Sequence, residues 1–262
     1  MTALDTALET ELLDVAIEAA RAAGAELLAR WRRPLEVGTK STPTDPVTEA
    51  DVNAERVIRE ILGRRRPADA ILGEEGGETG DGDLRWVVDP LDGTVNFMYG
   101  LPTFAVSVAV EDADGALAGV VLDPVRDELF SATRSGSALS NGEPITASTV
   151  DDFGHALIGT GFGYEPEVRA LQAAVAARVL PVARDIRRAG AAALDLCSCA
   201  SGHLDAYWER GVKAWDIRAG ALICERAGLV VRPLEPAGIL PAGIAVAAPA
   251  LIDQLMDLVS GP

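Results

Sequence analysis

The chain has 262 residues and is 48% hydrophobic, which is enough apolar material for one large domain or two fused lobes with a buried core. Asp and Glu number 40 against 23 Lys and Arg, and the net charge of −17 argues against a surface for nucleic acid or anionic membrane. No run of eighteen apolar residues occurs, and the first twenty residues carry acids where a signal peptide carries bases, so we expect a soluble, cytoplasmic protein.

Two helices are predicted at the start of the chain. Apolar residues recur every three or four positions from Leu8 to Trp31, which predicts a long helix that ends before Pro34. A second helix is predicted within 44–62 and must stop before Pro67. Its expected apolar stripe consists of Val57, Ile58, Ile61 and Leu62. The Pro- and Thr-rich stretch 38–48 is expected to form a loop that folds over a neighbouring site.

Short, closely spaced strands are predicted next, and we expect them to pair antiparallel, with a tight hairpin turn at "DADG". They are 70–73, 85–89, 104–112, 116–123 and 128–134. After Asn141 and Gly142, short strands alternate with helices predicted over 166–180 and 216–228. This change of pattern predicts an N-terminal α+β lobe, residues 1–148, with an antiparallel sheet, followed by a C-terminal α/β lobe, residues 149–262.

The stretch "WVVDPLDGTVNFMYG", residues 86–100, concentrates chemically useful groups. Asp89 ends a predicted buried strand, Pro90 is expected to end the sheet ladder, and Asp92 follows. Gly93 and Thr94 then open a short helical turn whose free N–H groups would bind an anion. Two carboxylates beside a phosphate cradle indicate a metal site. The alternative interpretation is that Asp92 only caps this helix, which leaves Asp89 unexplained.

Acids also stand at two other element ends. Glu74 and Glu75 follow the strand 70–73, and Asp216 lies in the first turn of a predicted amphipathic helix, where it could be an ordinary cap. The segment 76–83, rich in Gly and acids, is expected to be a solvated loop.

Cysteines and histidines carry no catalytic pattern. Cys197, Cys199 and Cys224 are too few for a disulfide framework, so we expect buried, reduced thiols. His155 and His203 stand alone, and we expect structural or surface roles for both.

Together these stretches resemble a known family. "WVVDPLDGTVNF" and "WDIRAGALICERAG", supported by "DPVTEAD", "GEEGG" and "GVVLDPVRDELFSA", are similar to the inositol monophosphatase family of magnesium-dependent, lithium-sensitive sugar phosphatases. The stretches "IGTGFGY", "DIRRAGAAALDLC" and "DAYWERGVKAWD" resemble its bacterial inositol-1-monophosphatase type. The resemblance covers nearly the whole chain. It implies a layered αβαβα sugar-phosphatase fold, a homodimer, and hydrolysis of a phosphate monoester, in the first place myo-inositol 1-phosphate.

The resemblance also implies a metal site for two to three Mg²⁺ ions. Glu74, Asp89 and the carbonyl oxygen of Leu91 would hold the first ion, and Asp89, Asp92 and Asp216 the second, while Glu74 helps a weaker third. Oxygen ligands of this kind suit a hard cation. Carboxylates about 5 Å apart repel by roughly 3 kcal/mol per pair at an effective dielectric of about 20, so four of them need cations. Those cations would also let an acidic protein bind phosphate.

Catalytic roles are implied for three side chains. Glu74 and Thr94 would hold the attacking water, and Asp51 would accept a hydrogen bond from Thr94. The alternative for Asp51 is purely structural, because Thr48-x-x-Asp51 has the form of a capping box. For Glu75 no role is expected, since Glu74 fills the ligand position.

Substrate contacts follow from the same resemblance. They are expected from Asp92, Gly93, Thr94, Gly190, Ala192, Glu209 and Lys40. Glu209 would accept hydrogen bonds from ring hydroxyls, which suits a polyol, while the backbone of 190–193 lines the pocket. Ala191 stands where many relatives carry Thr or Ser, and this departure weakens the case for strict inositol selectivity.

Two alternatives remain open. One is another phosphomonoesterase of the superfamily, acting on histidinol phosphate, fructose 1,6-bisphosphate or a 3′-phosphoadenosine nucleotide. The other is a binding role with a protein partner in RNA processing, without direct contact to nucleic acid.

Overall fold

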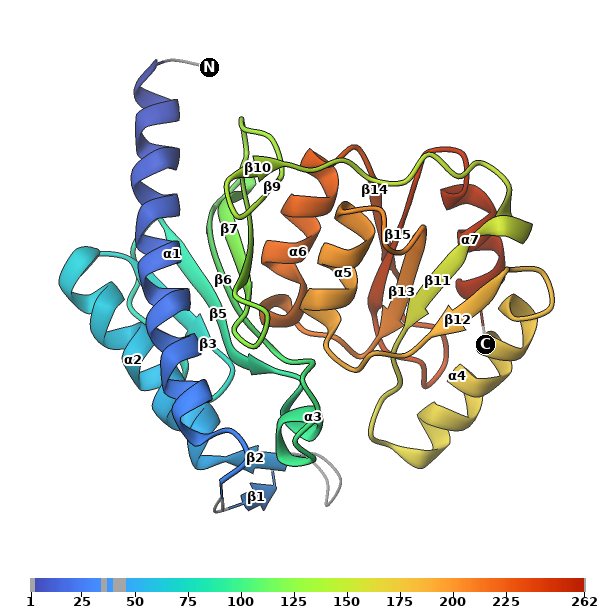
Figure 1. The fold of residues 1–262 in the computed structure, drawn as a ribbon, viewed down its shortest axis with the longest axis horizontal. Helices are drawn as coiled ribbons and strands as arrows, with labels where there is room; N and C mark the ends of the chain where they lie inside the picture. The colour runs from blue at the N-terminus through green and yellow to red at the C-terminus, as the bar shows by residue number, and fades with distance from the viewer. Residues whose placement is uncertain (1–2, 34–36, 40–45, 262) are drawn as a thin grey trace.

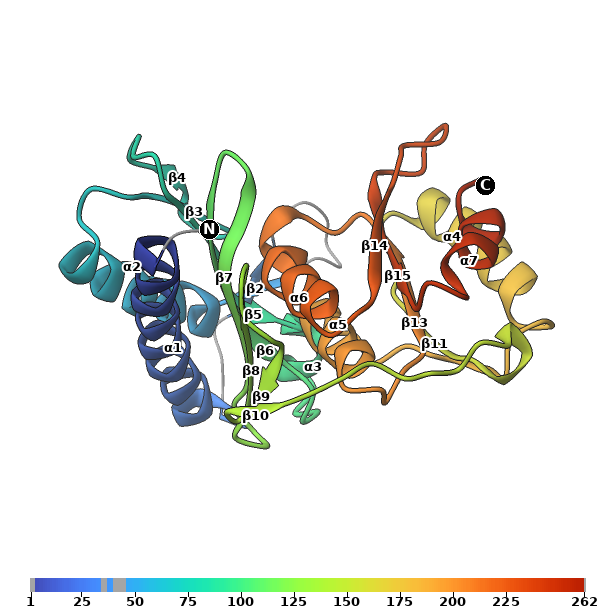
Figure 2. The same cartoon turned by 90° about the horizontal axis from the view of Figure 1, so that it is seen from above.

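The computed structural model describes residues 3–33, 37–39 and 46–261, which form five layers (Figure 1). Helices α1 (Ala3–Arg30) and α2 (Glu49–Arg65) cover the outer face of an eight-stranded sheet. Helices α5 (Ala192–Ala200) and α6 (Ala214–Arg226) lie between this sheet and a five-stranded sheet. Helices α4 (Pro166–Val179) and α7 (Ile252–Val259) cover the far side, as the view from above also shows (Figure 2). The predicted αβαβα layering is confirmed.

The two N-terminal helices form where the apolar spacing predicted them. In α1 most side chains at the predicted spacing are fully or almost fully buried, namely Leu12, Val15, Ala19, Ala23 and Leu27, whereas Leu8 is half-buried. Helix α2 begins after its N-cap Thr48, and its buried face includes two acids, Asp51 and Glu55, that the apolar stripe did not predict, whereas Val57 is only half-buried. Carboxylates on a buried helix face need partners. The hydrogen-bond partners of Asp51 connect helix α2 to the site described below.

The first sheet has the order β10-β9-β8-β7-β6-β5-β3-β4. Its strands are β3 (Ala70–Gly73), β4 (Gly77–Thr79), β5 (Arg85–Asp92), β6 (Ala105–Asp112), β7 (Gly115–Asp123), β8 (Glu128–Thr133), β9 (Leu139–Ser140) and β10 (Glu143–Pro144). A separate pair, β1 (Val37–Thr39) and β2 (Pro46–Thr48), lies beside the start of α2. The turn at 112–115 joins β6 to β7 as predicted.

Three expectations about this sheet are wrong. Strands β3 and β5 pair parallel, because exposed β4 forms a hairpin with β3 and the chain then returns to the start of β3 before β5 begins. The segment 76–83 is therefore part edge strand rather than loop throughout. Strand β5 also continues through Pro90 to Asp92, since a bulge between Asp89 and Asp92 accommodates a residue that cannot donate to the ladder.

The second sheet is mixed, in the order β12-β11-β13-β15-β14. Its strands are β11 (Leu157–Thr160), β12 (Asp185–Arg187), β13 (Ala206–Arg210), β14 (Val230–Leu234) and β15 (Gly243–Ala247), and one turn of 3₁₀ helix, η1 (Phe153–His155), precedes β11. The pairs of β11 with β12 and β13 are parallel, and the two other pairs are antiparallel. This agrees with the α/β character expected for the C-terminal part.

The central helix layer is shared by both sheets. One buried cluster joins Ala109 and Phe130 of the first sheet to α5, α6 and Tyr207 of the second. A Cβ added at Gly119 of β7 would lie 2.9 Å from the α-carbon of Ala219 in α6, so this helix packs directly on the sheet. The predicted boundary at residue 148 stays a prediction. It falls within 145–152, which forms neither helix nor strand.

Within the described residues, none of the helices combines the length and apolar character needed to cross a bilayer. The three cysteines are buried free thiols, as predicted.

Candidate active site

A cavity of about 540 Å³ opens where the ends of β3, β5 and β13 meet the starts of α3 (Thr94–Met98), α5 and α6. Ten of the residues singled out from the sequence line it: Glu74, Asp89, Leu91, Asp92, Gly93, Thr94, Gly190, Ala192, Glu209 and Asp216. Asp51 does not line it but lies directly behind Thr94. Lys40 lies outside the described residues, so its approach to the site stays a prediction.

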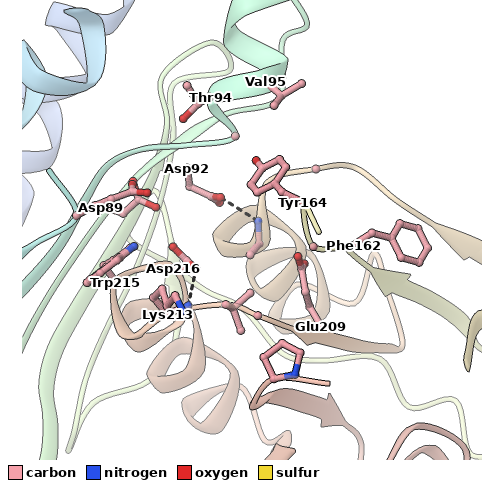
Figure 3. A pocket seen from close by; sticks show the side chains of 18 of the residues that line it. Asp89, Asp92, Thr94, Val95, Phe162, Tyr164, Glu209, Lys213, Trp215 and Asp216 are labelled. Carbon is pink, nitrogen blue, oxygen red and sulfur yellow. Dashed lines mark hydrogen bonds between the residues drawn. The ribbon is translucent and has the colours of Figure 1, made fainter. Parts of the chain in front are cut away.

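The acids reach the cavity from elements far apart in the sequence. Glu74 follows β3, and the bulge of β5 presents Asp89 and Asp92. Asp216 comes from the first turn of α6. Figure 3 shows Asp89, Asp92 and Asp216 around one space, with Glu209 on the other side of Asp92. Strand ends and helix starts thus gather the predicted carboxylates.

Electrostatics confirm that these carboxylates oppose one another's ionisation. Burial raises the pKa of Asp89 well above its ordinary range, and the negative charges of Glu74, Asp216 and Asp92 raise it further. Burial is also the main cause that raises the pKa of Asp216 to about 7, against the lowering effect of the Lys213 N–H. The pKa of Asp92 is raised by burial and then by Asp216, while the Ala193 N–H lowers it. A cation in this space would relieve the repulsion.

The donor set fits a hard metal ion by its chemistry, because it consists of carboxylate and carbonyl oxygens. As the side chains stand, however, no three His, Cys, Asp or Glu among the described residues are arranged to hold one ion. Asp89 instead lies within hydrogen-bonding reach of Glu74 and Asp216. Its Oδ1 also accepts the Leu91 N–H at 2.9 Å.

Asp92 caps a helix, but not the one expected. The N-cap of α3 is Gly93, at φ +91°, with no side-chain hydrogen bond, so the interpretation of Asp92 as the cap of this helix is wrong. Asp92 accepts the N–H groups of Ala192 (3.2 Å) and Ala193 (2.7 Å) at the start of α5. Two features explain this contact. The bulge of β5 directs Asp92 toward the start of α5, and the N-cap of α5, Ala191, has no side-chain oxygen of its own.

Asp216 and Asp51 each combine a structural and a site position. Asp216 accepts the Lys213 N–H at 2.6 Å, as an ordinary cap would, and also lines the cavity. Asp51 accepts both the N–H (2.9 Å) and the hydroxyl (2.6 Å) of Thr48 through Oδ2. Its Oδ1 lies 3.0 Å from the Thr94 hydroxyl, which is also 3.1 Å from the Leu91 carbonyl. For Asp51, the capping box and the contact with Thr94 exist together.

The start of α3 is joined to the start of α5. A Cβ at Gly93 would lie 3.0 Å from the Thr103 carbonyl and 3.2 Å from that of Gly190, so only glycine fits there without a shift. Buried Asn96 donates to the carbonyls of Thr103 (2.8 Å) and Ala189 (2.9 Å). This clamp was not predicted, because nothing in the local pattern reveals what an asparagine will contact.

Glu209 faces the acids across the cavity. Its carboxylate accepts the Tyr207 hydroxyl at 2.5 Å. Burial raises its pKa, whereas the Tyr207 hydrogen bond and the positive charge of Arg188 lower it. Arg188, Lys213 and an apolar wall with Phe162 complete the lining, and none of them was predicted. They lie in stretches that resemble the family, but they come from loops that meet only in the folded chain.

A model of the inositol monophosphatase family matches residues 8–259. The chain belongs to this family. An inositol-1-monophosphatase of Mycobacterium leprae is 47% identical over 232 residues, which are 84% of this chain and 80% of the relative. Nus factor SuhB of Pasteurella multocida is 39% identical over 253 residues, 94% of each chain. The crystal structure of extragenic suppressor protein suhB from Bartonella henselae matches with a TM-score of 0.87 at 34% identity, covering 94% of this chain and 96% of that one.

Membership of the inositol monophosphatase family confirms the resemblance and the fold expected from the sequence. The chain is thus an enzyme of a metal-dependent family that hydrolyses phosphate monoesters.

Proposed function

We propose that the protein is a Mg²⁺-dependent phosphatase that converts myo-inositol 1-phosphate into myo-inositol and inorganic phosphate. One observation carries the proposal: four carboxylates and the start of α3 line one side of a cavity, and Glu209 lines another. The carboxylates suit metal ions, the helix start suits a phosphate, and Glu209 suits hydroxyl groups.

In this proposal Glu74, Asp89, the Leu91 carbonyl, Asp92 and Asp216 would hold two to three Mg²⁺ ions. When bound, they supply positive charge for the phosphate and lower the pKa of coordinated water. The N–H groups of Gly93 and Thr94 hold phosphate oxygens. The Thr94 hydroxyl, 3.0 Å from Asp51, and the Glu74 carboxylate orient the attacking water. These residues position the reactants, which is most of what phosphate ester hydrolysis requires.

The leaving alcohol would lie against Glu209 and the backbone at Gly190 and Ala192. A carboxylate accepts hydrogen bonds from several hydroxyls of a polyol and offers nothing to an apolar alcohol. Histidinol phosphate, fructose 1,6-bisphosphate and a 3′-phosphoadenosine nucleotide are the alternative substrates. A protein-partner role in RNA processing is a second candidate, favoured by the relative named Nus factor SuhB.

A substrate panel tests the choice of ester. With Mg²⁺, we expect the purified protein to hydrolyse inositol 1-phosphate at the highest kcat/KM. A tenfold or larger preference for one of the alternative esters would remove inositol 1-phosphate as the substrate.

Asp92→Asn tests the metal assignment. We expect hydrolysis to fall at least about a thousandfold, or roughly 4 kcal/mol, because a carboxylate ligand is lost. The fold should persist, since asparagine can still cap α5. Asp253→Asn, at an exposed ion pair with Arg232, is the matched control and should keep full activity. Unchanged turnover in Asp92→Asn would contradict the metal assignment.

The homodimer, the cytoplasmic location and lithium sensitivity stay predictions. Sedimentation of the purified protein and inhibition by Li⁺ at fixed Mg²⁺ would check the first and the last.

A further inference from the structure

Tyr207 is a buried phenol that the proposed mechanism does not use. It is fully buried on β13, two residues before Glu209, and alternate residues of a strand point to the same face. Its hydroxyl donates to Oε2 of Glu209 at 2.5 Å. Burial and the charge of Glu209 raise the pKa of Tyr207 well above its ordinary range, so this hydroxyl stays protonated and donates.

Gly161 holds the same carboxylate from a second side. It directly follows β11, which pairs with β13 so that Thr160 lies opposite Trp208. A Cβ built at Gly161 would lie 2.0 Å from Oε2 and 2.1 Å from Oε1 of Glu209. Both carboxylate oxygens therefore lie directly against the bare α-carbon of Gly161. Any larger residue would push the carboxylate away.

These two contacts determine what Glu209 offers to the cavity. One oxygen already receives a hydrogen bond, and the plane of the carboxylate is set by the glycine. The remaining lone pairs, chiefly those of Oε1, can only accept. A fixed acceptor recognises a donor at a fixed place.

We infer that Tyr207 and Gly161 are positioning residues that hold Glu209 as a fixed acceptor for a hydroxyl of the leaving alcohol. On this inference, selectivity for polyol phosphates over esters without such a hydroxyl depends on the Tyr207 hydroxyl. The inference rests on the proposed function, because it concerns the alcohol that the proposed reaction releases.

Tyr207→Phe removes only the hydroxyl and keeps the packing of the ring. We expect KM for inositol 1-phosphate to rise about tenfold, since Glu209 loses a charged hydrogen bond and its fixed orientation. The kcat should stay within about twofold, because the metal ligands are untouched. For phenyl phosphate, whose leaving group has no other hydroxyl, kcat/KM should be unchanged. Tyr99→Phe, at a side chain 78% exposed, is the matched control and should behave as wild type.

A double-mutant cycle separates positioning from general packing. If Tyr207 acts through Glu209, Tyr207→Phe should add nothing to KM in a Glu209→Gln background. Gly161→Ala should reproduce the selective rise in KM from the opposite side, and it carries the test if thermal unfolding shows that Tyr207→Phe does not fold.

Three outcomes would overturn the inference: an unchanged KM for inositol 1-phosphate in folded Tyr207→Phe or Gly161→Ala, an equal loss on phenyl phosphate, or additive effects with Glu209→Gln. Failure of the proposed function looks different. In that case the wild-type protein itself shows no Mg²⁺-dependent hydrolysis, or no preference for the polyol ester over phenyl phosphate.

Discussion

At the scale of single residues, the acids of this site hold the backbone as well as line the cavity. Asp92 accepts N–H groups at the start of α5, Asp216 accepts one at the start of α6, and Asp51 closes the capping box of α2. Each carboxylate is thereby oriented before any ligand binds. Structural and chemical interpretations of such an acid therefore need not exclude each other.

Asp51 allows these two roles to be separated. Asp51→Asn should lower kcat by about a hundredfold, because the acceptor of the Thr94 hydroxyl loses its charge. Thr48→Ala removes the hydroxyl of the capping box and should lower the free energy of unfolding by about 1 kcal/mol, with kcat within about threefold of wild type. Steady-state kinetics and denaturant unfolding of both variants check this. An equal loss of kcat in Thr48→Ala would mean that Asp51 is only structural.

At the scale of elements, the site depends on how α3 and α5 meet. Asn96 ties the start of α3 to the segment before α5, and Asp92 supplies the cap that Ala191 lacks. Of the N–H groups in the first turn of α5, those of Ala192 and Ala193 are bonded to Asp92. The N-cap of α5 therefore makes no local side-chain hydrogen bond, and the contact with Asp92 across the cavity takes its place.

Ala191→Ser should restore a local cap. Its hydroxyl would accept an N–H of the first turn, raising the free energy of unfolding by about 0.5–1 kcal/mol and Tm by roughly 2–3 °C. Ala189→Ser, an exposed position just before the helix, is the control and should leave Tm unchanged. A thermal melt checks both variants. A lower Tm in Ala191→Ser would show that the hydroxyl does not fit at this almost fully buried position.

At the scale of the whole molecule, buried negative charge limits stability without metal. Folding raises the pKa of Asp216 from an ordinary 3.8 to about 7, chiefly by burial. Between those values the folded protein binds protons that the unfolded chain releases, so stability must fall as pH rises. The contribution of Asp216 should level off above about pH 8, where this residue is ionised in both states. Burial and the negative charge of Glu209 raise the pKa of Asp195 to about 8, so ionisation of Asp195 also lowers the stability as pH rises.

Metal should therefore change the pH dependence of stability. In EDTA, we expect Tm to drop by at least about 5 °C between pH 5 and pH 8. With saturating Mg²⁺ the drop should shrink, because the ion binds the ionised carboxylates of the folded state only. Calorimetry at both pH values checks this, and Asp216→Asn should weaken the dependence in EDTA. A Tm that rises with pH in EDTA would contradict the electrostatic account.

The sequence revealed the fold best where structure is local. The regular apolar spacing of α1 and the turn at 112–115 depend on residues within a few positions of one another. Helix α5 was missed because it is short and buried nearly all round between two sheets, and a short apolar run of this kind fits a buried strand as well as a helix. The parallel pairing of β3 with β5 was missed because pairing depends on the path of the chain through β4.

For the site, the sequence by itself determined the family and the kind of chemistry, because the oxygen donors stand in long motifs at strand and helix ends. Only the tertiary structure decided that Asp92 caps α5, that Asp51 both caps α2 and meets Thr94, and that Tyr207 and Gly161 hold Glu209. The physical reason is the distance along the sequence between the residues that interact. The residues of a motif are neighbours in the sequence, whereas the hydrogen bond between Asp92 and Ala193 joins positions 101 residues apart. Such positions meet only when both sheets pack on the same helices.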